Sequence, residues 1–116
     1  MNFINIIHER NSSKMSDKVY TIEEIKKKTK NTLKRYAVKK AILFGSYAKN
    51  IQTPKSDIDI VIDSQGKLIN INFYGLLEEL SEDLDKNVDL IEISEIREDS
   101  PIYKNIKEEG VVLYEE

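Results

Sequence analysis

The hydrophobic and polar positions of this chain follow two periods, one typical of helices and one typical of strands. Between Thr21 and about Tyr36, one stripe at helical spacing is mostly apolar, and lysines lie mostly on the outer surface. Thr21 and Glu24 are three residues apart and match the capping-box pattern that begins a helix. The stripe contains Ile22, Ile25, Thr29, Leu33 and Tyr36. We therefore expect an amphipathic helix over residues 21–36.

Two further helices are predicted in the second half of the chain. One runs from Asn72 to Asp85 and carries core residues at helical spacing, namely Phe73, Leu76, Leu77, Leu80 and Leu84. The other is short and runs from Ser100 to about Glu108, with Pro101 in its first turn, where proline is favoured. Gly110 is expected to end it.

Four segments have the pattern of strands. The apolar run Ile42–Phe44 stops at Gly45-Ser46, where a buried strand gives way to a tight turn and a helix start. In Asp57–Ile62, three isoleucines alternate with Asp57, Asp59 and Val61. In Asn87–Ile93, apolar residues flank Asp89 on both sides, and Val111–Tyr114 is expected to be the last strand. Helices and strands thus alternate along the chain. This order predicts an α/β (α+β) fold with a small mixed β-sheet flanked by helices.

Composition and charge narrow the class of protein. The chain has 116 residues, 40% hydrophobic and 34% charged, which suits one soluble domain with a modest core. Its net charge of −3 argues against broad nucleic-acid binding through bulk electrostatics. It lacks cysteine, a signal-peptide pattern and any apolar run near the ~18 residues of a membrane span. We expect a cytoplasmic protein.

The first 19 residues are the least interpretable part of the sequence. Apolar residues near the start are interrupted by Asn11–Ser13. A short strand or helix packed on the body, a flexible tail and a partner contact all remain open. The expected organisation is therefore an N-terminal extension over residues 1–19 and one domain over residues 20–116.

Gly45 and Ser46 form the first half of a candidate nucleotide site. A turn at this position points free backbone N–H groups outward, and these donors, together with the positive end of a helix dipole, favour a phosphate oxygen. Glycine lets the ligand approach the backbone because it has no Cβ. The Ser46 hydroxyl adds one more donor. A glycine-serine pair after an apolar run is also an ordinary turn, so this feature alone decides little.

Asp57 and Asp59 form the second half. In a strand their side chains project on one side, with Cα atoms about 6.7 Å apart. Their like charges repel, and a bound divalent cation removes that cost. Oxygen-only ligands suit magnesium or manganese rather than zinc. The alternative is a pair of ordinary acids on the exposed face of a half-buried strand.

The two halves together resemble a known signature. Gly45-Ser46-Tyr47-Ala48, a short loop and then Ser56–Val61 are similar to the motif of the DNA polymerase beta-like nucleotidyltransferase superfamily. In particular, the chain resembles the minimal nucleotidyltransferases, small proteins usually encoded beside a HEPN-type partner. The resemblance covers most of residues 20–116. It implies the nucleotidyltransferase fold and a Mg-dependent transfer of a nucleoside monophosphate, with ATP as substrate.

The same resemblance implies a third carboxylate on a later strand. Asp89 is the candidate, because Val88 and Leu90 alternate about it, whereas Glu92 is three residues on and faces away. The metal ligands and catalytic residues are then Asp57, Asp59 and Asp89. The nucleotide-binding residues are Gly45, Ser46, Lys49 and Ser56.

The sequence departs from the family pattern just after Ala48. Lys49 and Asn50 stand where the family commonly has arginine and glycine. Lys49 keeps the positive charge but lacks the planar fork that binds phosphate bidentately. Asn50 adopts the left-handed conformation more readily than most residues, so the turn can survive. Neither change removes a metal ligand.

Three functions remain open at this stage. The resemblance implies an antitoxin that transfers AMP to a tyrosine hydroxyl of a HEPN ribonuclease toxin. The alternative is a non-catalytic binding module that neutralises its partner by occlusion and keeps a vestigial nucleotide site. A third is transfer to a small molecule or an RNA end in a complex with another subunit.

Overall fold

The computed structural model describes residues 18–116, and most of the predicted N-terminal extension lies outside these described residues. Helices and strands alternate in the predicted order. They are α2 (Ile22–Arg35), β1 (Lys40–Phe44), α3 (Gly45–Lys49), β2 (Ile58–Asp63), α4 (Asn70–Leu84), β3 (Val88–Glu92), the 3-10 helix η1 (Ile93–Glu95), α5 (Pro101–Glu109) and β4 (Val111–Glu115). The predicted fold class is confirmed.

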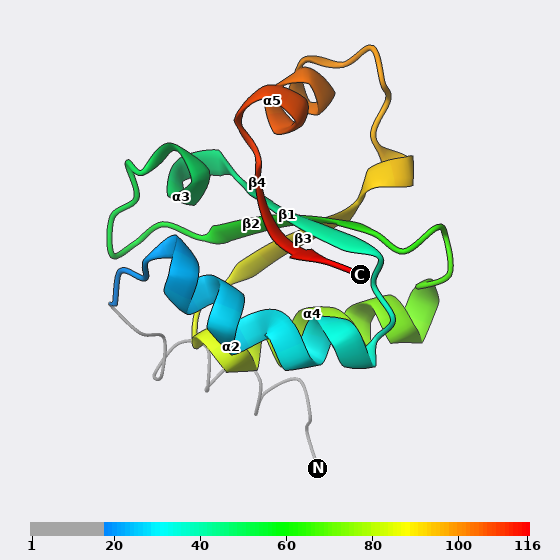
Figure 1. The fold of residues 1–116 in the computed structure, drawn as a ribbon, viewed down its shortest axis with the longest axis horizontal. Coiled ribbons are helices and arrows are strands. Elements are labelled where there is room, and N and C mark those ends of the chain that lie inside the picture. Colours follow the sequence, from blue (N-terminus) through cyan, green and yellow to red (C-terminus); the bar gives the residue numbers. More distant parts are fainter. Residues whose placement is uncertain (1–17) are drawn as a thin grey trace.

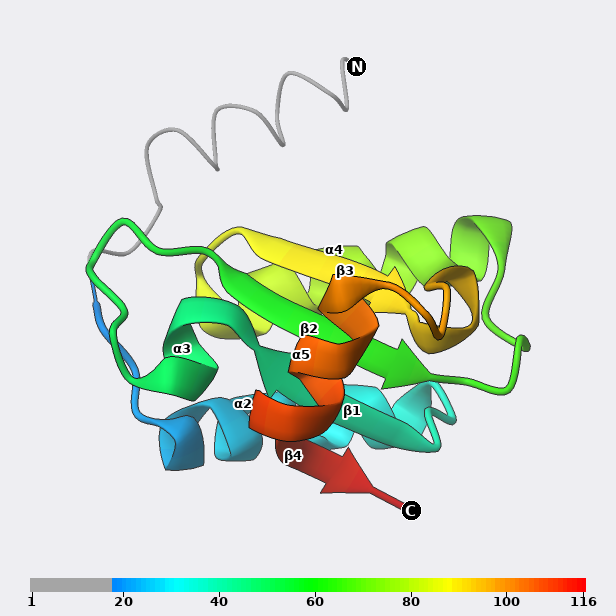
Figure 2. The same ribbon diagram turned by 90° about the horizontal axis from the view of Figure 1, so that it is seen from above.

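The four strands form one mixed sheet in the order β3-β2-β1-β4. Strand β1 is antiparallel to both β2 and β4, whereas β2 and β3 are parallel. Parallel neighbours need a long crossover, which α4 supplies. Helices α2 and α4 cover one face of the sheet, and α3 and α5 lie on the other (Figure 1). The view from above shows α5 crossing that second face (Figure 2).

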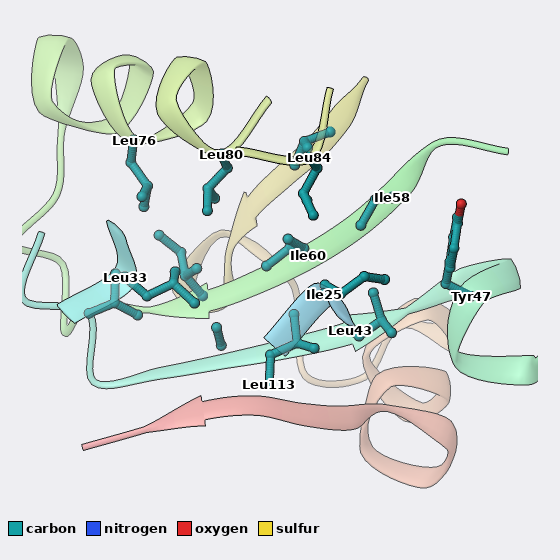
Figure 3. Close-up of a cluster of buried hydrophobic side chains, with 14 of the residues drawn as sticks. Ile25, Leu33, Leu43, Tyr47, Ile58, Ile60, Leu76, Leu80, Leu84 and Leu113 are labelled. Carbon is teal, nitrogen blue, oxygen red and sulfur yellow. The ribbon is translucent and has the colours of Figure 1, made fainter. Parts of the chain in front are cut away.

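The core lies between the sheet and the α2–α4 layer. Strand β2 contributes Ile58, Ile60 and Ile62, which are fully buried because alternate side chains point to the same face. The helices contribute Ile25, Leu33, Leu76, Leu80 and Leu84, also fully buried (Figure 3). Burying each such side chain stabilises the fold by about 1.5–3 kcal/mol. Three of the four predicted leucines of α4 are therefore core residues, and the fourth, Leu77, is partly buried and packs against the core.

Helix ends follow the predicted signals. Thr21 Oγ1 accepts a hydrogen bond from the Glu24 N–H at 3.1 Å, and the Thr21 N–H donates to Glu24 Oε1 at 2.9 Å, so the capping box is present. Helix α5 has Pro101 at its start and ends at Gly110. Among residues 18–116, none of the helices has the length and apolar character needed to cross a bilayer.

Helix α4 begins at Asn70, two residues before the predicted start. Its first turn faces solvent, and Ile71 is 82% exposed. The core-facing pattern therefore begins only at Phe73, which is why the sequence pattern placed the start of the helix too late.

Candidate active site at one end of the sheet

Alternation along β2 separates the core from the candidate site. Ile58 and Ile60 point into the core, so Asp59 between them points to the opposite face, where α3 and α5 lie. Asp57, just before the strand, is exposed, and Asp59 is half-buried. The predicted division of this segment into an apolar face and an acidic face is confirmed.

The parallel pairing of β2 and β3 brings a second acid beside the first. Asp59 and Asp89 are direct partners in the register of the two strands. Val88 is buried and Asp89 is exposed, so β3 also presents its acid away from the core. Two acids from segments 30 positions apart therefore lie side by side on one face of the sheet.

Glu92 has a separate, structural role. Its side chain is buried and accepts hydrogen bonds from the Ser64 N–H at 3.3 Å and from the Ser64 hydroxyl. It thereby ties the end of β3 to the segment that follows β2. Its position agrees with the expectation that Glu92 faces away from Asp89.

The glycine of the turn contacts Asp59. Phe44 pairs with Asp59 across β1 and β2, so Gly45 follows directly beside that carboxylate. Gly45 has φ +73°, and a Cβ at this position would lie 2.2 Å from Asp59 Oδ2. Only glycine fits both the backbone conformation and the space. The two halves of the sequence motif are therefore adjacent, with the side chain of Asp59 in the space that a Cβ of residue 45 would need.

Helix α3 starts at Gly45 without a side-chain cap, because Phe44 at its N-cap has no hydrogen-bonding group. Asn50 ends the helix in the left-handed conformation, with φ 61° and ψ 36°. Asparagine therefore replaces the glycine of the family pattern without loss of the turn, as expected. The N–H groups of Asn50 and Ile51 bond back to carbonyl groups of α3.

Two of the predicted nucleotide-binding residues contact other parts of the protein. Ser56 Oγ accepts a hydrogen bond from the Thr53 N–H at 2.9 Å, within the loop before β2. Lys49 lies at the far end of α3, and its Nζ is 3.9 Å from Glu109 Oε2 of α5. Ser56 thus shapes the loop that carries Asp57, and Lys49 links α3 to α5.

The environment of Asp59 disfavours its ionised form. Burial, a hydrogen bond with Asp89 and the negative charges of Asp89 and Asp57 raise the pKa of Asp59 from 3.8 to about 6. The charged form is therefore disfavoured when no cation is near. Carboxylate oxygens on two adjacent strands suit magnesium or manganese, and a divalent cation would relieve this repulsion.

The three acids suit a metal ion in the type of donor atom and in charge, but they are not arranged as a complete metal site. Among residues 18–116, no three histidine, cysteine or acidic side chains stand in a group ready to hold a metal ion. Asp59 and Asp89 meet, while Asp57 contributes its charge from an exposed position. Rotation of the exposed Asp57 side chain would be needed to add a third carboxylate.

Lys86 is a structural residue of the site that sequence reasoning missed. It is only 3% exposed, and its Nζ donates to the Pro54 carbonyl at 2.8 Å. The bond joins the residues before β3 to the loop that carries Ser56 and Asp57. The sequence gives no signal for it, because a lysine between a helix and a strand usually lies in solvent.

A groove of about 550 Å³ adjoins the two acids. Asp59 and Asp89 line it together with apolar side chains of β1, α4, β3 and α5. The apolar lining residues are Phe44, Phe73, Tyr74, Leu77, Val88, Leu90, Ile91 and Ile102. The two acids are therefore open to a ligand from the side of β3.

The chain is similar in sequence to a known family and to named relatives. The family model described as polymerase beta, nucleotidyltransferase, matches residues 27–116. A Methanocaldococcus jannaschii protein named "Putative protein adenylyltransferase" is 41% identical over 92 residues, covering 78% of this chain and 92% of the relative.

Solved structures share the fold. A toxin–antitoxin complex with AMP-PNP has a chain that matches with a TM-score of 0.68 and 27% identity, over 78% of this chain and 73% of that one. A structure of the tri-AMPylated HEPN toxin of Shewanella oneidensis with its MNT antitoxin matches with a TM-score of 0.64 and 23% identity, over 83% and 74% of the two chains. The chain is thus an enzyme of the polymerase beta-like nucleotidyltransferase family, a minimal nucleotidyltransferase homologous to proteins named as protein adenylyltransferases.

Proposed function

We propose that this chain transfers AMP from ATP to a tyrosine hydroxyl of a HEPN-type toxin, in a magnesium-dependent reaction, and so acts as an antitoxin. The observation that carries the proposal is the direct pairing of Asp59 with Asp89 beside the Gly45 turn. Relatives named as protein adenylyltransferases, and a structural neighbour bound to an AMPylated HEPN toxin, support the choice of acceptor.

The residues divide the work by position. The uncapped N–H groups at the start of α3, beginning at Gly45, would hold the β and γ phosphates. Asp59, with Asp57 and Asp89, would hold magnesium, which when bound neutralises charge on the phosphoryl oxygens. Asp89 is exposed and would accept the proton of the acceptor hydroxyl. The acceptor oxygen bonds to the α-phosphorus as the bond to the bridging oxygen breaks, and pyrophosphate leaves.

Positioning of the reacting groups contributes to such a reaction together with charge stabilisation. Gly45 limits the movement of Asp59, because the backbone of the turn lies against that carboxylate. Lys86 holds the Pro54 carbonyl in the loop before Asp57. These contacts fix the part of the site that contains Asp57 and Asp59. The part that contains Asp89 is exposed and can be reached by the acceptor.

The test is transfer of label from α-labelled ATP to the HEPN-type toxin that we propose as the acceptor. We expect a labelled partner with the native chain and none with the Asp57→Asn, Asp59→Asn double variant. Asp63→Asn is the matched control, since Asp63 ends the same strand and its Oδ1 accepts from the Gln65 N–H. Equal labelling by the double variant would overturn the proposal.

A second candidate is a binding module that neutralises its partner without catalysis. The engagement of Ser56 with Thr53 and of Lys49 with Glu109 favours it, because two predicted nucleotide contacts are used within the protein. A melting experiment separates the two functions, since a ligand that binds only the folded state raises the melting temperature. The enzyme predicts a rise with magnesium and millimolar ATP, and the module predicts none.

A further inference from the structure

Strand β3 forms one edge of the sheet. Within residues 18–116 it pairs with β2 on one side only, so the backbone groups along its other side have no strand partner. Figure 2 shows β3 at the border of the sheet, with α4 alongside it. A free strand edge of this kind is a template for pairing with an extended segment of another chain.

The groove beside the acids follows this edge. Four consecutive residues of β3, from Val88 to Ile91, line it. Since neighbouring side chains of a strand point to opposite faces, a groove touching all four runs along the side of the strand. A second groove, of about 420 Å³, shares Leu90 and Ile91 and continues to Glu92. Together the grooves follow the full length of β3.

The outer wall of the grooves is apolar and unusually exposed. Tyr74 of α4 lines both grooves and is 66% exposed. Ile69, the residue before this helix, lines the second groove and is 59% exposed. Ile71, in the first turn of the helix, lines neither groove but adds a nearby apolar side chain that is 82% exposed. None of these side chains is part of the buried core. The exposed apolar residues stand out because 34% of the chain is charged, and charged residues are the usual choice for a surface in contact with water. Exposed apolar side chains grouped in this way mark a surface that binds a partner.

Charge and position specify what the grooves accept. Glu95 lines the second groove and, unlike Asp59 and Asp89, has no bound cation in the proposed reaction to balance its charge, so positive side chains on the ligand would be favoured beside it. The groove that contains Asp59 and Asp89 is the one that follows β3. A chain lying along this edge therefore passes directly beside the acids.

We propose that the acceptor protein binds β3 as a fifth strand, through an extended segment with apolar side chains and basic flanking residues. Tyr74 packs against the apolar side chains of that segment. The acceptor hydroxyl lies level with Asp89. The inference rests on the proposed function, because it concerns the acceptor of the same reaction.

The test compares the two edges of the sheet. Tyr74→Lys places a positive charge in the groove beside β3, and Val112→Lys makes the same kind of change on β4, where Val112 is 40% exposed. Both side chains are exposed, so we expect both variants to fold. The probe is the HEPN-type toxin proposed as the acceptor, labelled from α-labelled ATP. We expect Tyr74→Lys to raise the KM for this acceptor by about tenfold or more.

The remaining readouts exclude a general defect. For Tyr74→Lys, the KM for ATP should stay within about twofold of the native value, and Val112→Lys should leave both KM values within that range. An acceptor KM unchanged by Tyr74→Lys would overturn the inference. So would an equal rise caused by Val112→Lys. A stable dimer of the chain alone that Tyr74→Lys dissolves would assign the surface to a second copy and would also overturn it.

Hydrogen exchange separates this inference from the proposed function. In the complex with the HEPN-type protein, we expect added protection of the amides of residues 88–92 but not of residues 111–115. If the native chain transfers no label, the proposed function fails, and the exchange experiment still decides whether the partner lies on β3. Unchanged exchange over residues 88–92 in the complex would overturn the fifth strand.

Discussion

The two faces of the sheet differ in the residues that β2 places on them and in what those residues do. On one face, Ile58, Ile60 and Ile62 pack against α2 and α4 and are fully buried. On the other, Asp59 lies half-buried beside another acid, with its pKa raised to about 6. The apolar face stabilises the fold, whereas the acidic face costs stability that a bound cation would return. Because successive side chains of a strand point to opposite faces, the same strand places stabilising residues on one face and the candidate catalytic residues on the other.

The sharpest contrast lies within β3, between Asp89 and Glu92. We expect Asp89→Asn to lower the rate of AMP transfer by about 1000-fold, equivalent to ~4 kcal/mol, because the group that meets the acceptor is lost. Its melting temperature should not fall, since Asp89 is exposed. Rates of label transfer and melting curves measure the two effects.

Glu92→Gln is the matched variant on the opposite face. It weakens the buried hydrogen bonds to Ser64, so we expect a stability loss of about 1–2 kcal/mol with transfer nearly unchanged in the folded protein. If Glu92→Gln abolished transfer and Asp89→Asn did not, the assignment of catalysis to Asp89 and of a structural role to Glu92 would be wrong.

A substitution on the apolar face of the sheet should lower the stability of the protein strongly without a direct effect on catalysis. Ile60→Ala removes a fully buried side chain from the centre of β2, and we expect a loss of about 3 kcal/mol in the free energy of unfolding. Denaturant titration measures it. A loss below about 1 kcal/mol would mean that this side chain is not packed in the core.

Gly45 and Gly66 provide a comparison of site and surface. Both have φ +73°, but a Cβ would meet Asp59 at Gly45 and nothing within 4 Å at Gly66. We expect Gly45→Ala and Gly66→Ala each to cost about 1–2 kcal/mol of stability from backbone strain. Only Gly45→Ala should also slow transfer, by about tenfold or more, because Asp59 must turn aside. Equal rates of transfer in the two variants would show that the close approach of Gly45 to Asp59 is not needed for activity.

The smallest expected effect is a gain. In metal-free buffer at pH 8, Asp59→Asn should stabilise the protein by about 1 kcal/mol, because it removes a half-buried charge beside Asp89. A carboxyl whose pKa is raised in the folded state costs stability above that pKa. The gain should therefore fade as the pH falls from about 6 towards the ordinary value of 3.8. Melting curves with a chelator at pH 8 and pH 4.5 measure it, and a gain that grew at pH 4.5 would contradict the cause given.

Local pattern was enough to predict much of this molecule. Period-two alternation in β2 separated Ile60 from Asp59, and the capping box placed the start of α2. The left-handed Asn50 was expected from its intrinsic preference. These features depend only on neighbours along the chain, which is why the sequence is informative about them.

Features that depend on long-range contacts were not predictable in the same way. Residue spacing does not give the register between Asp59 and Asp89, because α4 separates their strands, and only the family resemblance implied that these strands are neighbours. The Gly45 contact with Asp59 needs two antiparallel strands in register. The Ser56 hydrogen bond, the Lys49 ion pair and the buried Lys86 likewise depend on tertiary packing.

The central claim is that Asp59 and Asp89, beside the Gly45 turn, hold the metal and the nucleotide. Crystals grown with manganese and a non-hydrolysable ATP analogue test it most directly, through the anomalous signal of manganese. The account predicts manganese bound to oxygens of both Asp59 and Asp89, with the terminal phosphates at the start of α3. Manganese that binds neither Asp59 nor Asp89, or a triphosphate that does not reach Gly45, would contradict it.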